Sequence, residues 1–276
     1  MCMAELELLI EPETLAAELG NDELLIIDVC SADSYKTHHI PGAVHIPPAE
    51  LQAGTKPAVG KIPEKKRLDA LFSAAGLNTS KHVVVYDDEG GGWAGRLIWT
   101  LDVLGHRNYS YVNGGLHAWL AAGLPVTTEL PTTAPSEFVG EWHEEFIAEA
   151  VDVLDAIDDD DQAIWDARSP EEYRGEKVVA QRGGHIPGAI NIDWLELMDR
   201  ERQLRLVDLQ DLQQRLDKLG LSKDKTVITH CQTHHRSGLS YLAMKILGYD
   251  KIKGYHGSWS EWGNREDTPI NTGANP

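Results

Sequence analysis

Short apolar runs alternate with stretches of helical periodicity along this chain. In its second half, the runs at 163–167 (AIWDA) and Thr226–Thr229 are typical of buried strands. Residues 208–220 (DLQDLQQRLDKLG) and Ser237–Leu247 carry apolar residues at helical spacing, and Gly248 ends the second of these helices. Strands separated by helices indicate βα units and a parallel sheet covered on both faces. We therefore predict an α/β fold.

The same landmarks occur twice along the chain and in the same order. The pentapeptide HIPGA at 39–43 returns at 185–189, and VNGGLHAW at 112–119 corresponds to YHGSWSEW at 255–262. This pattern indicates a duplicated domain rather than a solenoid, whose repeats span only about 20–50 residues. A stretch rich in Pro and Thr at 125–138 is typical of an extended linker. We expect a first domain at 1–130, a linker at 131–142 and a second domain at 143–276.

Composition narrows the possible functions. The 276 residues include 44 acidic and 25 basic side chains, which give a formal net charge of −19. Nucleic acids and anionic membranes require a positive surface, so we expect neither as a partner. No apolar run approaches the ~18–20 residues that cross a bilayer, and the N-terminus lacks the features of a signal peptide. Three distant cysteines argue against a disulfide framework, and we expect a cytoplasmic protein.

Cys231 has the sequence context of a reactive thiol. It follows a buried-type strand, and a helix begins about six residues later. A loop that enters a helix presents unpaired backbone N–H groups toward one point, which favours the thiolate over the thiol. Arg236, with His234 and His235, adds positive charge. We therefore favour a nucleophile over an inert buried cysteine.

The spacing within this loop restricts what it can hold. The string HCQTHHRS at 230–237 places four residues between Cys231 and Arg236, whereas cysteine-dependent phosphatases carry five between the same two residue types. The shorter loop forms a narrower cradle, which suits a sulfur atom on Cys231 better than a phosphate group. Because the loop contains no acidic residue between His230 and Leu247, we also expect a locally positive pocket.

These motifs together resemble the tandem-domain rhodaneses, which are thiosulfate:cyanide sulfurtransferases. The strings that carry the resemblance are DARS at 166–169, GHIPGA at 184–189, the CQTHHRS loop and YHGSWSEW at 255–262. The resemblance implies two tandem rhodanese-like domains, each a parallel sheet flanked by helices, of which the second is catalytic and the first inactive. It also implies that thiosulfate loads Cys231 with sulfur as a persulfide, and that cyanide or a thiol acceptor removes it. We expect no metal and no separate cofactor, and we assign substrate binding to the rest of the loop, namely Gln232, Thr233, His234, His235, Arg236 and Ser237.

The first copy carries an acid where the second carries its cysteine. Aligning Val83–Val85 with Val227–Thr229 places Asp87 opposite Cys231, and the acidic, glycine-rich residues that follow argue for a structural loop. A metal site at Asp87 and its acidic neighbours lacks an ordered pattern of ligands.

Other polar residues receive structural interpretations. We expect Asp166 and Arg168 to form an internal ion pair beside the GHIP turn, and His39 and His185 to stabilise equivalent turns. Arg182 has the character of a solvated loop charge, although it could also bind substrate. In rhodanese relatives that use mercaptopyruvate, an arginine stands where this chain has Glu172, so the resemblance makes that substrate doubtful.

Two other functions stay open at this point. In the first, Cys231 belongs to a persulfide carrier that delivers sulfur to partner proteins, and the His-rich loop leaves room for this alternative. In the second, less favoured, the loop serves a cysteine-dependent phosphatase or arsenate reductase.

Overall fold

The structure is a computed structural model that describes residues 6–276, and these residues form two compact units. Unit 1 comprises the residues up to Leu51, Pro63–His143 and Met198–Leu206. Unit 2 comprises Gln52–Ile62, Glu144–Leu197 and Val207–Pro276. Each unit therefore includes one short segment from the other half of the chain. The predicted domain boundaries assign both of these segments to the opposite domain.

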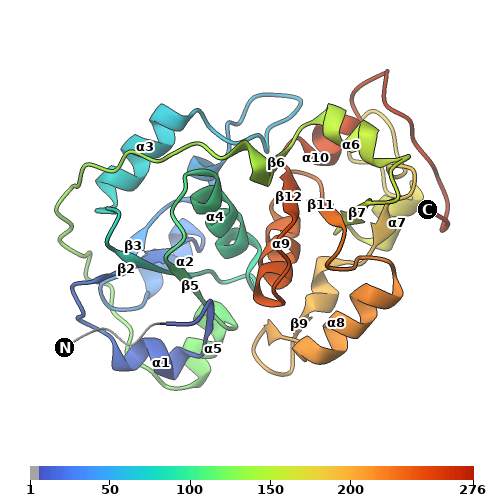
Figure 1. Cartoon of the computed structure of the whole chain (residues 1–276). Coiled ribbons are helices and arrows are strands. Elements are labelled where there is room, and N and C mark those ends of the chain that lie inside the picture. The colour runs from blue at the N-terminus through green and yellow to red at the C-terminus, as the bar shows by residue number, and fades with distance from the viewer. Residues whose placement is uncertain (1–5) are drawn as a thin grey trace. The chain divides into compact units, whose positions relative to one another are not determined.

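Unit 1 is built around a parallel sheet with the strand order β1-β5-β4-β2-β3, flanked by helices (Figure 1). Its strands are β1 (Leu9–Ile10), β2 (Leu24–Asp28), β3 (Val44–His45), β4 (His82–Tyr86) and β5 (Tyr109–Val112). Its helices are α1 (Pro12–Ala17), α2 (Ala32–Thr37), the 3-10 helix η1 (Pro48–Leu51), α3 (Lys65–Ala74), α4 (Gly92–Val103) and α5 (Gly115–Ala121). The segment from the second half adds a two-stranded antiparallel ribbon of β9 (Met198–Asp199) and β10 (Arg205–Leu206).

Unit 2 repeats this arrangement with the strand order β6-β12-β11-β7-β8, again all parallel. Its strands are β6 (Ile147–Ala148), β7 (Gln162–Asp166), β8 (Ile190–Asn191), β11 (Thr226–His230) and β12 (Ile252–Tyr255). Its helices are η2 (Glu144–Phe146), α6 (Ala150–Ala156), α7 (Pro170–Arg174), η3 (Trp194–Leu197), α8 (Leu209–Lys218), α9 (Arg236–Ile246) and α10 (Ser258–Trp262). The predicted α/β class and the predicted duplication are both confirmed, and the four elements expected from periodicity differ from the observed ones by at most two residues at either end.

The central strands explain why each unit folds around its sheet. All five residues of β2 and of β4 are buried, as are four of the five in β7 and in β11. Strands that are covered on both faces carry continuous apolar runs, which is the pattern that identified them in the sequence. Burial of these runs between helices supplies the main stabilising free energy of each unit.

The repeated histidines stabilise turns in both units, as predicted. His39 Nδ1 is hydrogen-bonded to the Tyr35 carbonyl at 2.8 Å, and its ring stacks on that of Tyr35 with 4.0 Å between centroids. His185 makes the equivalent contacts with Tyr173, at 2.8 Å and 3.7 Å. Because both copies share this arrangement, it belongs to the fold and not to the chemistry of one unit.

The predicted linker packs along unit 1. The Phe138 side chain is buried, and its backbone N–H donates to the Ser73 hydroxyl at 2.9 Å. Ser136 N–H donates to the Ser73 carbonyl at 2.9 Å. These contacts with the end of α3 explain why residues 131–142 belong to unit 1.

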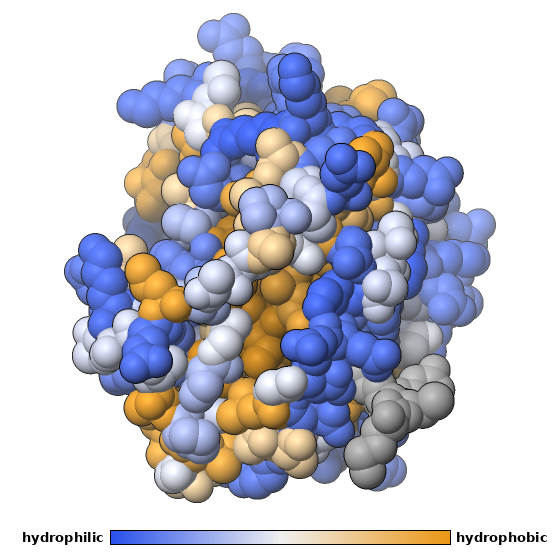
Figure 2. All heavy atoms as spheres, turned by 90° about the vertical axis from the view of Figure 1, so that its left-hand side faces the viewer, coloured by the Kyte–Doolittle hydropathy of each residue, from blue (hydrophilic) through white to orange (hydrophobic). Residues whose placement is uncertain are grey.

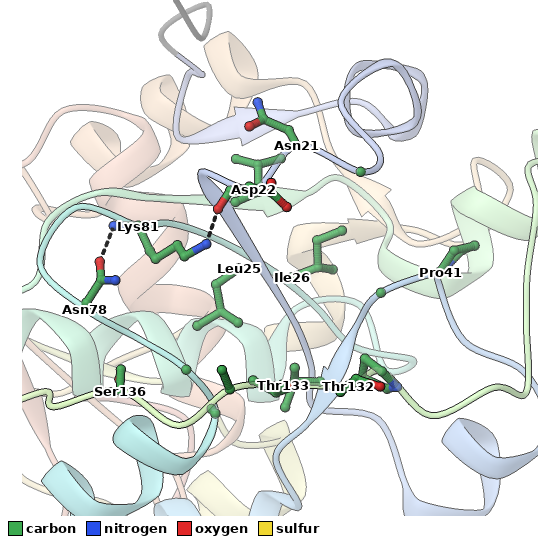
Figure 3. Close-up of a pocket in the computed structure, with 18 of the residues that line it drawn as sticks. Asn21, Asp22, Leu25, Ile26, Pro41, Asn78, Lys81, Thr132, Thr133 and Ser136 are labelled. Atoms are coloured by element: carbon green, nitrogen blue, oxygen red, sulfur yellow. Dashed lines mark hydrogen bonds between the residues drawn. The ribbon is translucent and has the colours of Figure 1, made fainter.

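The largest cavity described in unit 1 lies at the amino end of the sheet and is a feature of the fold. It has a volume of about 670 Å³, with Leu25 and Ile26 of β2 on one side and Thr132 and Thr133 on the other (Figure 3). Figure 2 shows the face of the molecule on the left of Figure 1, where apolar side chains are exposed in a strip between hydrophilic ones. Pro41 and Gly42 also line the cavity of unit 1. In unit 2 a smaller cavity of about 390 Å³ is lined by the equivalent residues Pro187 and Gly188. Ligands of open parallel sheets bind at the opposite, carboxyl ends of the strands, so neither cavity is the candidate site.

Within residues 6–276, none of the helices combines the length and the apolar character that a bilayer-spanning helix requires.

Candidate active site

Cys231 lies at the carboxyl end of the central strand of unit 2. Strand β11 ends at His230 and is flanked by β7 and β12, and α9 begins at Arg236 (Figure 1). The loop from Cys231 to His235 therefore connects a strand directly to a helix N-terminus, as the sequence predicts. The Cys231 side chain is fully buried beneath this loop.

The surroundings of the Cys231 thiol favour its ionised form. Burial raises the pKa of the thiol, but three influences outweigh burial and bring the pKa below its usual value. The first is the positive charge of Arg236, the second is hydrogen bonding from the amide and hydroxyl of Ser237, and the third is the amide of Thr233. These donors come from the loop and from the first turn of α9, where helical N–H groups have no partner within the helix.

The start of α10 holds the other side of the loop. Cys231 N–H donates to the Ser258 hydroxyl at 3.3 Å, and the N–H of Trp259 donates to the Cys231 carbonyl at 2.9 Å. Ser260 N–H donates to the Gln232 carbonyl at 3.0 Å. The YHGSWSEW motif, noted in the sequence as a landmark of the repeat and of the family resemblance, therefore forms a wall of the candidate site.

The two loop histidines occupy different environments. His234 is buried, has a left-handed backbone with φ of 58°, and places Nδ1 2.7 Å from the Ser237 hydroxyl oxygen. Hydrogen bonding from the same hydroxyl lowers the pKa of the Cys231 thiol, so Ser237 links His234 to the sulfur. His235 is partly exposed, and its ring lies 5.5 Å from that of Trp194. His234 therefore does not face solvent.

Gln232 and Thr233 also differ in whether they face solvent or the thiol. Gln232 is partly exposed and its Nε2 donates to the Val179 carbonyl at 3.4 Å, whereas Thr233 presents its amide to the thiol. The loop thus surrounds the sulfur mainly with backbone donors.

Arg236 is paired with an acid that the sequence analysis did not connect to the loop. Its guanidinium donates to both carboxylate oxygens of Glu172, at 2.6 Å and 3.0 Å, and the Glu172 side chain is only 4% exposed. The expected positive pocket is therefore only partly correct, because a buried carboxylate offsets much of the Arg236 charge. Glu172 also caps α7 together with Ser169.

Asp166 and Arg168 form the predicted internal ion pair beneath the loop. Arg168 donates from Nη2 to Asp166 Oδ2 at 2.6 Å and from Nε to Oδ1 at 3.0 Å, and both side chains are buried. The same Nη2 donates to the Gly184 carbonyl at 2.8 Å, which fixes the GHIP turn as expected. Burial lowers the pKa of the neighbouring His230 to about 4 even though Asp166 opposes this, so that ring is neutral at pH 7.

Arg182 differs from its predicted role. Its guanidinium donates to the carbonyls of Thr268 at 2.9 Å and Trp262 at 3.0 Å, so it is neither a solvated loop charge nor available to a substrate. Trp262 is the last residue of α10, and the carbonyls of the last turn of a helix have no partner within that helix. An arginine that satisfies these carbonyls has a structural role.

The equivalent loop of unit 1 surrounds a carboxyl group. Asp87 follows β4 as Cys231 follows β11, and its two oxygens accept hydrogen bonds of 2.8–3.2 Å from the backbone amides of Glu89, Gly90, Gly91, Trp93 and Ala94. The Asp87 carboxyl therefore fills the cradle from within, which agrees with the structural loop predicted for this copy. In both units the loop after the central strand therefore directs backbone N–H groups at one ionisable side chain, Asp87 in unit 1 and Cys231 in unit 2.

A substitution at Glu172 tests how far this acid restrains the thiol. In Glu172→Gln the Arg236 charge is no longer offset, so the pKa of Cys231 falls further and iodoacetamide alkylation at pH 6 is expected to be about threefold faster. Mapping the alkylated Cys231 peptide over a pH series measures this, with the exposed neighbour Glu171→Gln as a control that leaves the rate unchanged. An unchanged or slower rate in Glu172→Gln would contradict the electrostatic argument.

Comparison with known proteins agrees with this geometry. The rhodanese-like domain model matches twice, over residues 11–122 and 149–265. The chain is 51% identical over 267 residues to a thiosulfate sulfurtransferase of Azotobacter vinelandii, covering 97% of this chain and 98% of the relative. It is also 34% identical to the sulfur carrier protein TtuD of Thermus thermophilus, covering 95% of this chain and 92% of that protein. A solved anaerobic ergothioneine biosynthesis enzyme of Chlorobium limicola shares the fold, with a TM-score of 0.86 at 20% identity over 97% of this chain and 70% of that one. The chain belongs to the rhodanese family and carries two rhodanese-like domains.

Proposed function

We propose that this protein is a thiosulfate sulfurtransferase in which Cys231 carries the transferred sulfur as a persulfide. The observation that carries the proposal is a buried cysteine whose pKa is lowered by loop amides and an arginine at the carboxyl end of a parallel strand. The similarity to the Azotobacter vinelandii thiosulfate sulfurtransferase supports the same substrate. Unit 1 has Asp87 at the equivalent position, so we assign the chemistry to unit 2 alone.

The reaction proceeds in two displacement steps. The Cys231 thiolate attacks the outer sulfur of thiosulfate, a new S–S bond forms, and sulfite leaves with the electron pair of the broken bond. A thiophilic acceptor such as cyanide then attacks the outer sulfur of the persulfide, which releases thiocyanate and restores the thiolate. The electrons balance within these steps, so we expect no metal and no separate cofactor.

The loop residues hold negative charge at each stage. The amides of Thr233 and Ser237 already point to the sulfur before the reaction, and such preorganised donors stabilise charge without reorganisation. His234 keeps the Ser237 hydroxyl directed at the sulfur. Gln232 and His235, both partly exposed, are the loop side chains that an incoming substrate would meet first.

A protein acceptor is the second candidate for the outgoing step. The similarity to a sulfur carrier protein supports delivery of the Cys231 sulfur to partner proteins in place of cyanide. The phosphatase alternative has less support, because Arg236 is held by Glu172 and a phosphate would have to displace that carboxylate. The cytoplasmic location also stays a proposal, based on cysteines that form no disulfide in the described chain.

Intact-protein mass spectrometry tests the proposal directly. Thiosulfate is expected to add one sulfur, about 32 Da, and cyanide to remove it with formation of thiocyanate. Peptide mapping should place that sulfur on Cys231. A protein that gains no mass from thiosulfate, or that carries the sulfur on another residue, would overturn the assignment.

A further inference from the structure

A short segment from the first half of the chain lies against the catalytic loop. Residues 52–62 belong to unit 2, although they follow η1 of unit 1 in the sequence. Gly60 is buried, and a Cβ built on it would lie 2.6 Å from Thr233 C, 2.7 Å from Thr233 Cα and still closer to Thr233 O. Gln52 Nε2 lies 3.5 Å from the same carbonyl oxygen. The backbone of the segment is therefore packed directly on the backbone of the loop.

Two residues beside Gly60 attach the segment to the rest of unit 2. Lys61 Nζ lies 2.9 Å from a carboxylate oxygen of Glu149 and 2.9 Å from one of Glu261. Ile62 N–H donates to His256 Nδ1 at 3.0 Å, and the other ring nitrogen of His256 lies 3.0 Å from Glu149. Ion pairs of Lys61 and a backbone hydrogen bond of Ile62 thus attach the two residues that follow Gly60.

The partners of Lys61 and Ile62 lie next to a residue that contacts Cys231. His256 and Glu261 lie on either side of Ser258, whose hydroxyl accepts from Cys231 N–H. Thr233 is consequently enclosed: Gly60 covers its Cα and carbonyl, while its amide faces the Cys231 thiol. A shift of Gly60 by even a few tenths of an ångström would move a donor that stabilises the thiolate, because hydrogen bonds weaken steeply with distance and angle.

We propose that Gly60, Lys61 and Ile62 form a clamp that positions Thr233 over Cys231 and so sets the reactivity of the thiol. Gly60 supplies the close approach that no other residue allows, and Lys61 keeps the clamp closed. The three are positioning residues, since they act through Thr233 and touch neither the sulfur nor a substrate. Only the effect on turnover rests on the proposed function, whereas the effect on thiol reactivity does not.

Lys61→Met tests the clamp without a steric clash, because the side chain is one-third exposed and methionine retains its length. The pH profile of Cys231 alkylation by iodoacetamide, followed on the mapped peptide, is expected to shift toward higher pH, with a rate three to ten times lower at pH 6. The kcat for thiosulfate should fall by a similar factor, with KM changed less than twofold. Gly60→Ala should show the same shift, and Lys61→Arg should restore most of the rate.

The matched control is Lys56→Met, which removes an equal charge from an exposed position of the same segment. It is expected to leave both the pH profile and kcat unchanged. Thermal unfolding of every variant separates a lost clamp from a lost fold, because a purely structural role would lower the midpoint and leave the pH profile in place. That outcome, or wild-type alkylation in both Lys61→Met and Gly60→Ala, would overturn the clamp.

The same data distinguish this inference from the proposed function. If the wild-type protein takes no sulfur from thiosulfate but Lys61→Met still slows alkylation, the proposed function fails and the clamp stands. If sulfur loading occurs and Lys61→Met loads and alkylates like the wild type, the clamp fails and the proposed function stands.

Discussion

Replacement of Cys231 by serine is expected to lower the rate of sulfur transfer from thiosulfate to cyanide by at least about 10⁴-fold. A serine hydroxyl remains protonated at neutral pH and cannot accept the outer sulfur, so the first displacement has no nucleophile. The loop donors remain in place in the variant, and any residual rate measures what they contribute on their own. Thiocyanate formation at saturating concentrations of both substrates gives the comparison.

Cys30→Ser is the matched control. Cys30 is buried in unit 1, where burial and the nearby acid Asp28 raise the pKa of its thiol far above the usual value. Loss of this thiol should therefore leave turnover within about twofold of the wild-type value. Turnover that depends on Cys30, or that survives in Cys231→Ser, would place the chemistry elsewhere.

The pH dependence of sulfur loading follows from the direction of the pKa shift of Cys231. Because the thiolate is the reactive form and its pKa is lowered, a larger fraction of Cys231 is reactive at neutral pH than of an ordinary thiol, and this fraction declines as pH falls through the folded-state pKa. The midpoint of the pH profile of sulfite release in a single turnover is thus expected to lie below the pKa of free cysteine. A midpoint at or above that value would show that the loop does not stabilise the thiolate.

Local patterns predicted the parts of the site that lie within a few residues of one another. Cys231 stands between a continuous apolar strand and a helix, and this order alone places it at the carboxyl end of the sheet. Asp166 and Arg168 are two residues apart at the end of β7, so their pairing is also a local matter. The repetition of the HIPGA landmark allowed the role of His185 to be inferred from its partner His39.

Contacts between distant residues could not be predicted in the same way. Glu172 lies 64 residues before Arg236, and its own surroundings form a helix-capping pattern that accounts for it fully. Gln52 and Thr233 are 181 residues apart, and the 52–62 segment has no periodicity or motif that distinguishes it from a surface loop. Arg182 has the sequence context of a solvated charge, and only the fold brings it to the carbonyls of Trp262 and Thr268. In each case the partner is chosen by the tertiary fold and leaves no trace in the neighbouring sequence.

The equivalent loops of the two units differ in the group that their amides contact. In unit 1 the amides bond to the Asp87 carboxyl, and in unit 2 they face the Cys231 sulfur. A loop that satisfies its N–H groups with its own side chain has no place for an external anion. The fold therefore provides the cradle in both units, and the residue after the central strand decides whether a carboxyl group or a thiol occupies it.

The second large effect is expected in stability. Arg168→Met should lower the free energy of unfolding by about 3–5 kcal/mol, the usual cost of removing one partner from a buried ion pair. Asp166 would remain buried without its arginine, and the contacts of that arginine with the Gly184 carbonyl and the Trp259 ring, 4.1 Å away, would also be lost. Urea unfolding at pH 7.5 measures the loss, and Arg174→Met, which removes an exposed ion pair from α7, should leave stability nearly unchanged.

Two further measurements assign this loss to the uncompensated carboxylate. Burial raises the pKa of Asp166, but Arg168 and His230 together bring it below its usual value, so the wild-type contribution is present above the unfolded-state pKa and is lost as pH falls through the folded-state pKa. Without Arg168 the buried acid favours its protonated form, and acidification relieves the penalty. The difference between Arg168→Met and the wild type should therefore shrink from pH 7.5 to pH 4.5, and Asp166→Asn added to Arg168→Met should recover part of the lost stability at pH 7.5. An equal difference at both pH values, with no recovery in the double variant, would mean that Arg168 stabilises the unit through packing on Trp259 and not through its charge.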